Sequence, residues 1–234
     1  MEDQSKKRSL KSFVLRQGRR TKAQQYALDH FWAVYGIENT VGVLDFQPIF
    51  GNSNPVTLEI GFGNGESLAA MALAEPARNF LGIEVHSPGV GHLLHLINEH
   101  QLQNIRVMNG DAVAILQQQI AAHSLDRLQL YFPDPWHKKR HNKRRIVQPE
   151  FVQLVASLLA PGGIFHMATD WEDYAVHMAA VMQASTAFCN CAPDPAASPY
   201  SPRPDFRPLT KFENRGVKLG HGVWDLLYYQ CKKG

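Results

Sequence analysis

The sequence predicts an α/β fold, a Rossmann-like doubly wound sheet that is mostly parallel and carries a basic N-terminal extension. From Val56 onward, short apolar runs alternate with segments of helical periodicity, a rhythm typical of βαβ units. The first run, Val56 to Ile60, is followed by alternating glycines at Gly61, Gly63 and Gly65 and then by a helical segment. This strand–turn–helix pattern predicts a ligand site at the end of the first strand, with an ordinary loop as the alternative for the glycine pattern alone.

The chain has 234 residues, enough for one well-packed core. We expect an extension over 1–50, partly disordered and with one helix, and a sheet domain over 51–234. The helix should span 21–35 with Thr21 as its N-cap, and a linker should follow over 36–54.

The alternation predicts each element of the sheet domain in turn. Strands are expected over 56–60, 79–84, 104–108, 126–132 and 162–168, and helices over 65–75, 87–101, 111–122, 148–160 and 171–186. A short strand at 187–192, a Pro- and Ser-rich loop over 193–208, a short helix at 212–218 and a terminal strand over 223–231 should complete the chain.

Composition narrows the class of protein. Hydrophobic residues make up 44% and charged residues 19%, as in ordinary globular proteins. No apolar run is long enough for a membrane span and no signal-peptide hydrophobic region is present, so we expect a cytoplasmic protein without membrane contact. The three cysteines, Cys189, Cys191 and Cys231, are expected to be reduced thiols, and no metal site is indicated.

The net charge of +3 is unevenly distributed. One basic cluster lies in the first 22 residues and a second runs from Lys138 to Arg145. Clustered Lys and Arg with few intervening acids are typical of a protein that binds a phosphate-rich partner. A solvated, disordered tail is the alternative for the first cluster.

Carboxylates follow three successive predicted strands. Glu59, Glu84 and Asp111 should lie on one edge of the sheet, because the carboxyl ends of parallel strands meet there. Glu84 also lies at about the spacing from the glycines at which a carboxylate accepts hydrogen bonds from ribose hydroxyls. A nucleoside-containing ligand with a cationic group fits this set better than a pyrophosphate does.

A fourth acid lies in an unusual loop after the predicted strand 126–132. Asp134 lies between two prolines, which restrict the backbone, and Trp136 and the basic cluster follow at once. An acid beside an aromatic ring, continued by a phosphate-binding strip, is typical of a base-modifying enzyme, and a basic surface loop is the alternative. Asp170 follows the predicted strand 162–168 and also lies beside an aromatic residue, Trp171, but it could simply cap the next helix. Thr210 and Glu213 have the spacing of a capping box, which structure alone would explain.

These stretches together closely resemble the bacterial tRNA (guanine-N7-)-methyltransferase family, TrmB. The residues that carry the resemblance are 16–19, 21–24, 58–66, 82–85, 109–112, 132–141 and 210–213. The resemblance covers nearly the whole chain, except for 187–203, which matches no motif. It implies a class I methyltransferase fold that uses S-adenosylmethionine to methylate a guanine at position 46, in the variable loop of tRNA.

The same resemblance implies roles for individual residues. The expected cofactor-binding residues are Glu59, Gly61, Gly63, Glu84, Asp111 and Asp134, and Asp134 is also the expected catalytic residue. The expected substrate-binding residues are Lys138, Asp170, Thr210 and Glu213, and the expected RNA contacts are Arg140, Lys143, Arg144 and Arg145. The partner is tRNA, and the protein itself is expected to be a monomer or homodimer.

The chemistry fits the residues without a general base. Guanine N7 carries a lone pair and no proton, so methylation requires placement and stabilisation of the developing positive charge, which Asp134 can provide. A nicotinamide-dependent oxidoreductase would share the glycine turn, but the carboxylates would repel its pyrophosphate. A non-catalytic RNA-binding module would not need aligned carboxylates. An exocyclic-amino methyltransferase has an Asp-Pro-Pro-aromatic motif, whose second proline is missing here.

Overall fold

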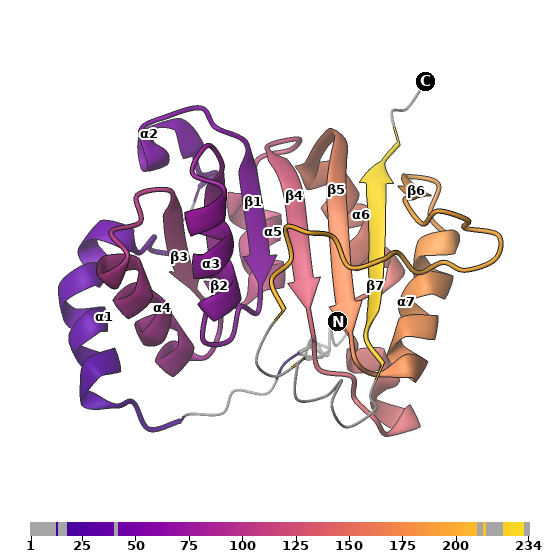
Figure 1. Ribbon diagram of the computed structural model, residues 1–234, viewed down its shortest axis with the longest axis horizontal. Helices are drawn as coiled ribbons and strands as arrows, with labels where there is room; N and C mark the ends of the chain where they lie inside the picture. Colours follow the sequence, from indigo (N-terminus) through magenta and orange to yellow (C-terminus); the bar gives the residue numbers. More distant parts are fainter. Residues whose placement is uncertain (1–12, 14–17, 40–41, 210–212, 214–221, 232–234) are drawn as a thin grey trace, which may run out of the picture.

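A seven-stranded sheet forms the centre of the protein, in the order β3-β2-β1-β4-β5-β7-β6 (Figure 1). The computed structural model describes residues 13, 18–39, 42–209, 213 and 222–231. Strands β1 to β5 are parallel, and β7 runs antiparallel to both β5 and β6. The predicted doubly wound, mostly parallel sheet is therefore confirmed. The winding reverses between β1 and β4, which is where ligands bind in such sheets.

The elements lie close to their predicted positions. The strands are β1 (Val56–Ile60), β2 (Asn79–Glu84), β3 (Ile105–Asn109), β4 (Leu125–Tyr131), β5 (Leu159–Thr169), β6 (Phe188–Asn190) and β7 (Trp224–Gln230). The helices are α1 (Lys22–Tyr35), α2 (Phe46–Phe50), α3 (Glu66–Ala74), α4 (Ser87–Glu99), α5 (Ala112–Gln119), α6 (Pro149–Leu158), α7 (Glu172–Gln183) and the 3-10 helix η1 (Lys139–Arg144). Thr21 caps α1 as predicted, and Gln24 completes a capping box with it.

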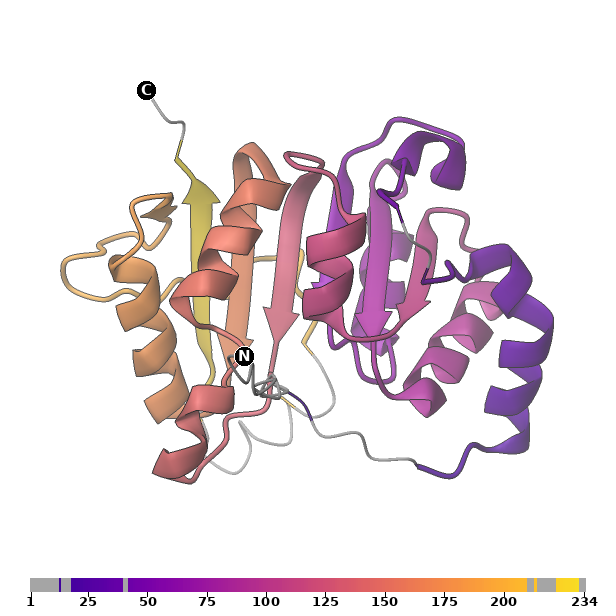
Figure 2. The same ribbon diagram turned by 180° about the vertical axis from the view of Figure 1, so that it is seen from behind.

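Two apolar clusters cover the two faces of the sheet. Helices α5, α6 and α7 pack on one face, which is the near face in Figure 2. Helices α3 and α4 cover β1 to β3 on the other face, and α1 lies alongside α4. An added Cβ at Gly91 of α4 would lie only 2.6 Å from the carbonyl oxygen of Gln24, so the two helices approach closely. The N-terminal helix thus extends the flanking layer of the sheet.

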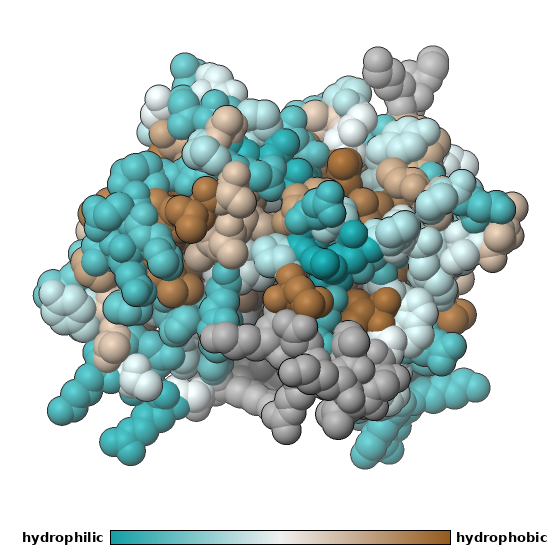
Figure 3. All heavy atoms as spheres, viewed as in Figure 1, coloured by the Kyte–Doolittle hydropathy of each residue, from teal (hydrophilic) through white to brown (hydrophobic). Residues whose placement is uncertain are grey.

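On the face that carries α3 and α4, strands β4, β5 and β7 are covered by an irregular loop rather than by a helix. Residues 191–209 cross in front of β7, β5 and β4 in Figure 1. Below this loop, inward-facing side chains of the strands are polar, among them Arg127, Gln129, His166 and Asp225. The space-filling view of this face shows polar residues over most of it, interrupted by smaller apolar areas toward its middle (Figure 3). A polar layer therefore lies between the sheet and the loop.

Two of the expected elements need correction, and two further expectations lie outside the described residues. The linker expected over 36–54 contains the short helix α2, capped by Asp45. Strand β5 begins at Leu159, three residues earlier than expected, because Leu159 pairs with Leu125 ahead of a register shift. The disorder expected near the N-terminus and the helix expected at 212–218 fall almost entirely outside the described residues. Among the described helices, none has the length and apolar character needed to cross a bilayer.

The prediction of three reduced thiols is wrong for two of them. Cys189 and Cys231 form a disulfide, with their Cα atoms 5.8 Å apart. They are 42 residues apart in the sequence, and the antiparallel pairing of β6 with β7 brings their backbones within bonding reach. Sequence spacing alone could not reveal this neighbourhood. Cys191 keeps a free, exposed thiol.

Candidate active site

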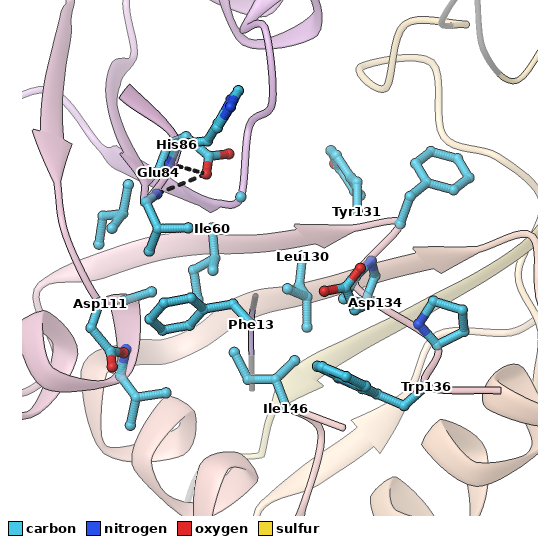
Figure 4. A pocket seen from close by; sticks show the side chains of 18 of the residues that line it. Phe13, Ile60, Glu84, His86, Asp111, Leu130, Tyr131, Asp134, Trp136 and Ile146 are labelled. Carbon is cyan, nitrogen blue, oxygen red and sulfur yellow. Dashed lines mark hydrogen bonds between the residues drawn. The ribbon is translucent and has the colours of Figure 1, made fainter. Parts of the chain in front are cut away.

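A cavity of about 610 Å³ lies at the carboxyl ends of β1, β2, β3 and β4. Its walls include Gly61, Glu84, Asp111, Asp134 and Trp136, so it brings together four of the predicted strand-end features (Figure 4). The volume is within the range of pockets that hold a cofactor. The position beside the winding reversal is the expected place for a ligand.

The glycine turn after β1 gives the cavity an open floor. Gly61 and Gly63 have left-handed φ angles of 72° and 59°, and nothing lies within 4 Å of a Cβ added at either. Non-glycine residues rarely adopt this conformation, and the empty space lets a ligand approach the backbone closely. At Gly89 of α4 an added Cβ would lie 2.0 Å from the Gly63 carbonyl oxygen, so this helix packs directly against the turn.

Glu84 at the end of β2 connects the strand to the glycine turn. Its Oε2 accepts a hydrogen bond from the backbone N–H of Gly63 at 2.9 Å. Its Oε1 accepts from the N–H groups of Val85 and His86, at 2.7 and 2.8 Å (Figure 4). Hydrogen bonds to a charged acceptor are among the stronger ones in proteins. The carboxylate therefore has a fixed position at the cavity wall.

Asp111 lies at the end of the neighbouring strand β3. Its Oδ1 accepts from the N–H of Val113 at 3.1 Å and caps α5. The residue also lines the cavity. It therefore combines a structural role with a position in the site, as Glu84 does.

Glu59 differs from the other carboxyl groups. It lies within β1, is buried, and is not part of the cavity wall in the described structure. Burial, with a smaller effect of Glu84, raises the pKa of Glu59 to about 8. Its Oε2 has no hydrogen-bond partner within the described part of the chain. Glu59 therefore carries a proton at neutral pH and lies behind the cavity.

The loop that carries Asp134 has an unusual backbone. Phe132 and Trp136 both have φ angles of 48°, a left-handed conformation that is unfavourable for bulky aromatic residues. The N–H of Phe132 donates to the carbonyl oxygen of Ala168 on β5 at 2.8 Å, which anchors the start of the loop. Strained backbone of this kind concentrates at functional sites. Asp134 lies midway between the two strained residues, exposed at the cavity.

The basic run after this loop folds as η1 and packs on Trp136. The guanidinium of Arg144 lies 3.7 Å from the centre of the Trp136 ring, and His141 meets the ring edge-on. Lys138 lines the cavity, and the exposed Arg140 and Lys143 lie beyond it.

Arg145 does not share this surface position. Its side chain is buried, donates to the carbonyl oxygen of Pro135 at 3.0 Å, forms an ion pair with Asp173, and packs over the Tyr174 ring. The sequence prediction placed Arg145 with the RNA contacts, but the described structure uses its guanidinium to hold the Asp134 loop against α7. Its charge is not presented to solvent.

The expected substrate-binding residues are distributed around this edge. Asp170 follows β5 and does not cap α7, whose N-cap is Trp171. Trp171 is exposed and lies against His137, with 4.5 Å between the ring centres. Glu213 is buried and bound by Arg207, with two oxygen–nitrogen distances of 2.7 and 2.8 Å. Thr210 lies outside the described residues.

Several cavity residues had not been predicted from the sequence. Phe13 points into the cavity between Asp111 and Ile146 (Figure 4). His86 and Tyr131 complete the wall. Phe13 lies in a polar, basic stretch without periodicity, so no sequence signal distinguished it. Tyr131 lies one residue before Phe132, within an apolar run that indicates a strand and no binding role.

Comparison with known proteins identifies the family. A family model described as "Putative methyltransferase" matches residues 53–226. A tRNA (guanine-N(7)-)-methyltransferase of Klebsiella pneumoniae subsp. pneumoniae is 59% identical, over 96% of this chain and 93% of the relative. A tRNA (guanine-N(7)-)-methyltransferase of Hydrogenovibrio crunogenus is 57% identical, over 95% of this chain and 91% of the relative.

Solved structures with much lower sequence identity share the fold. The 16S rRNA methyltransferase KamB superposes with a TM-score of 0.56 at 16% identity, over 81% of this chain and 94% of that chain. A SAM-dependent O-methyltransferase of Thermotoga maritima gives a TM-score of 0.51 at 14% identity, over 77% of this chain and 61% of that chain. With the cavity described above and relatives of this similarity, the chain belongs to the tRNA (guanine-N(7)-)-methyltransferase family.

Proposed function

We propose that this protein transfers the methyl group of S-adenosylmethionine to N7 of a guanine at position 46, in the variable loop of tRNA. The observation that carries the proposal is one cavity that joins a glycine turn to an acid–aromatic loop, next to an exposed basic helix. The glycine turn suits a nucleoside cofactor, and the acid–aromatic loop suits a nucleic-acid base. The basic helix suits a phosphate backbone. The names of the close relatives support the substrate.

The residues present fit S-adenosylmethionine. The left-handed Gly61 and Gly63 leave space that a ligand could fill, and Glu84 lies beside them at the end of β2. Asp111 faces the same cavity from β3. In this proposal Glu84 holds the ribose and Asp111 the base of the cofactor, with Asp134 at the cavity's reactive end. When bound, the cofactor supplies an electrophilic methyl group on a positively charged sulfur.

Asp134 is the proposed catalytic residue. No proton leaves guanine N7 when it is methylated, so the protein has to position the base and stabilise the positive charge that develops on its ring. A carboxylate does both, because it accepts from the donor edge of the guanine and carries negative charge. The strained residues on either side of Asp134 support this role by fixing the position of the loop before the base arrives.

Glu59 has a different proposed role. It lies behind the glycine turn as a protonated acid, and its proposed contribution to cofactor binding is to support that turn from within the sheet. Lys138, Asp170, Thr210 and Glu213 are proposed to hold the guanine. Arg140, Lys143 and Arg144 are proposed to contact tRNA phosphates.

The proposal extends to the setting of the reaction. A guanine in the folded core of tRNA must be drawn out of its tertiary contacts, at an estimated cost of a few kcal/mol. Contacts between the basic helix and the tRNA backbone would offset this cost. An enzyme acting on tRNA would work in the cytoplasm. The cavity would be accessible in either a monomer or a homodimer. We also propose that a basic extension ends near residue 50, where the methyltransferase domain begins.

Methylation of defined transcripts tests the proposal. The protein is incubated with radiolabelled S-adenosylmethionine and either a tRNA with guanine at position 46 or the same tRNA with adenine there. We expect label only in the first transcript, released by chemical cleavage at 7-methylguanine. Label that resists this cleavage would indicate the exocyclic-amino chemistry instead. Equal labelling of both transcripts would contradict the assigned position.

A further inference from the structure

A buried arginine joins the segment before β7 to the sheet. Arg207 is only 1% exposed and forms two pairs of hydrogen bonds with carboxylates. Its Nη1 and Nη2 donate to Glu213 at 2.7 and 2.8 Å, and its Nε and Nη2 donate to Asp225 of β7, both at 2.8 Å. Paired hydrogen bonds of this kind fix direction as well as distance, because guanidinium and carboxylate are both planar.

The connection continues across the sheet. Asp225 Oδ1 also accepts from His166 Nε2 on β5 at 2.7 Å, and His166 Nδ1 lies 2.9 Å from the hydroxyl of Tyr131 on β4. Burial lowers the pKa of His166 and raises that of Tyr131, so both groups are neutral at pH 7. Tyr131 then donates to Nδ1, and Nε2–H donates to Asp225. Five side chains thus form one continuous hydrogen-bonded chain.

Strand register explains how the chain spans three strands. Tyr131, Ala168 and Asp225 lie directly opposite one another on β4, β5 and β7. The small side chain of Ala168 leaves room between the two larger residues, and His166 fills it from two positions earlier on β5. The chain therefore ends at the last residue of β4, immediately before the left-handed Phe132 that opens the Asp134 loop.

The cluster is poorly explained by stability alone. Buried ion pairs lose much of their attraction to desolvation, and apolar side chains of similar size often stabilise a fold as well. What the cluster supplies is geometry, since each partner has one allowed position. The guanidinium carbon of Arg207 lies 5.8 and 5.9 Å from the ring centres of Tyr131 and Phe132, so the arginine packs close to both residues at the start of the loop.

We propose that Arg207 is a positioning residue for methyl transfer. Arg207 holds Glu213, which is proposed to bind the substrate. Through Asp225, His166 and Tyr131 it also fixes Phe132, the first residue of the Asp134 loop. This inference rests on the proposed function, in which Glu213 binds substrate and Asp134 is catalytic. Neither role is possible unless both residues keep a fixed separation, and Arg207 connects the two segments that carry them.

The test uses Arg207→Lys, which keeps the charge but cannot form two paired sets of hydrogen bonds. Arg127→Lys is the matched control. Arg127 lies on the same face of β4, four residues before Tyr131, and is also mostly buried in an ion pair, with Glu75. Its guanidinium lies 3.8 Å from the centre of the Phe206 ring, so it also contacts the covering loop. The control therefore disturbs the same polar layer between the sheet and the loop, but far from the carboxyl ends of the strands that form the cavity.

Single-turnover methylation of tRNA at saturating cofactor and tRNA is measured for each folded variant, with the tRNA dissociation constant and the melting temperature. We expect Arg207→Lys to lower the single-turnover rate at least tenfold while changing the tRNA dissociation constant less than threefold, because phosphate contacts dominate binding. Arg127→Lys should lower the melting temperature but keep the rate within twofold of the unmodified protein.

A full single-turnover rate in Arg207→Lys would overturn the inference, even if the melting temperature fell. If Arg207→Lys does not fold, Tyr131→Phe decides the question, since it removes one hydroxyl at the far end of the chain and keeps the ring. A rate reduced severalfold in Tyr131→Phe supports the inference, and an unchanged rate overturns it. Absence of methylation by the unmodified protein would instead contradict the proposed function.

Discussion

Single residues in this site differ mainly in how the protein satisfies their polar atoms. Glu84 accepts three backbone hydrogen bonds and forms part of the cavity wall. Glu59, on the adjacent strand, has an unpartnered buried oxygen among the described residues and a pKa raised to about 8. Two acids that look equivalent in the sequence are therefore a carboxylate fixed by backbone hydrogen bonds and a buried acid that keeps its proton at neutral pH.

The negative charge of Asp134 should set the rate of methyl transfer. Asp134→Asn keeps the shape of the side chain and loses the charge that is proposed to stabilise the methylated guanine. We expect the single-turnover rate, at saturating cofactor and tRNA, to fall by about 10². The tRNA dissociation constant should change little, since phosphate contacts dominate it. A full rate would show that Asp134 only shapes the turn, a role that Asn fills equally well.

Removal of the Glu84 carboxylate should weaken cofactor binding. Glu84→Ala loses the acceptor for Gly63 and the proposed contact with the ribose. Hydrogen bonds to charged groups contribute about 1.5–3 kcal/mol each, so the dissociation constant measured by calorimetry should rise at least tenfold. Glu99→Ala, on the exposed end of α4, is the control and should bind normally. Equal affinity in both variants would exclude Glu84 from the site.

Glu59 should make stability depend on pH. The folded state keeps the proton of Glu59 up to about pH 8, whereas in the unfolded chain the group ionises near 4.5. Its contribution to stability therefore falls as pH rises through that window. The Gln side chain of Glu59→Gln does not titrate. The unfolding free energy of this variant, minus that of the unmodified protein, should therefore increase from pH 5 to pH 8 by up to about 4 kcal/mol and then level off. Urea unfolding without cofactor measures this, and a constant offset would contradict it.

Sequence reasoning was more successful with strand-end acids than with residues inside the strands. Glu84, Asp111 and Asp134 follow apolar runs, and all three line the cavity. The buried cluster around Arg207 left a weaker signal, an alternation of polar residues in β4 at Arg127, Gln129 and Tyr131. The apolar residues of this segment predict a buried strand, although the alternation also predicts one polar face. Only the structure shows the loop that covers this face.

At the scale of elements, the loop between β4 and α6 concentrates the unusual features of the chain. It contains both strained aromatic residues, the catalytic candidate and the basic helix η1. The two prolines predicted a restricted backbone, but φ angles of 48° at Phe132 and Trp136 were not predictable. Such angles persist only when surrounding contacts determine them, and here the contacts come from β5 and from Arg145.

Arg145 should matter for stability rather than for RNA. Arg145→Ala removes the hydrogen bond to Pro135 and the contacts with Asp173 and Tyr174. We expect a loss of about 2 kcal/mol, or a fall in melting temperature of about 4–8 °C for a chain of this size. Lys143→Ala, which is exposed two residues away, should leave the melting temperature within about 1–2 °C. Equal melting curves would return Arg145 to the RNA-binding surface.

Element boundaries show which local signals are reliable. Strands β1 and β2 match their predicted ranges, because each is a short apolar run bounded by turn residues. The start of β5 was less well predicted because Pro161 and Gly162 interrupt its apolar pattern. Helix α2, at five residues, is too short for periodicity to reveal. The Cys189–Cys231 disulfide depends on strand pairing, which no local pattern encodes.

At the scale of the whole molecule, the fold separates binding from support. The carboxyl ends of the parallel strands hold the cavity and the exposed part of η1, whereas other cations lie at the opposite ends of the strands. Arg78 precedes β2, and Arg106 is the second residue of β3. The net charge of +3 is modest, so the position of the cations, more than their number, should decide where a polyanion binds.

This separation predicts how salt affects tRNA binding. Arg140 and Lys143 are exposed next to the cavity, and each phosphate contact they make releases counterions when tRNA binds. Changing both to Gln should flatten the slope of log affinity against log salt by about two units, one per lost contact. Arg78→Gln with Arg106→Gln removes the same charge from the opposite edge and should leave the slope within half a unit. Filter binding from 50 to 300 mM salt measures both pairs. If the two pairs flatten the slope equally, tRNA responds to net charge alone and η1 is not its binding surface.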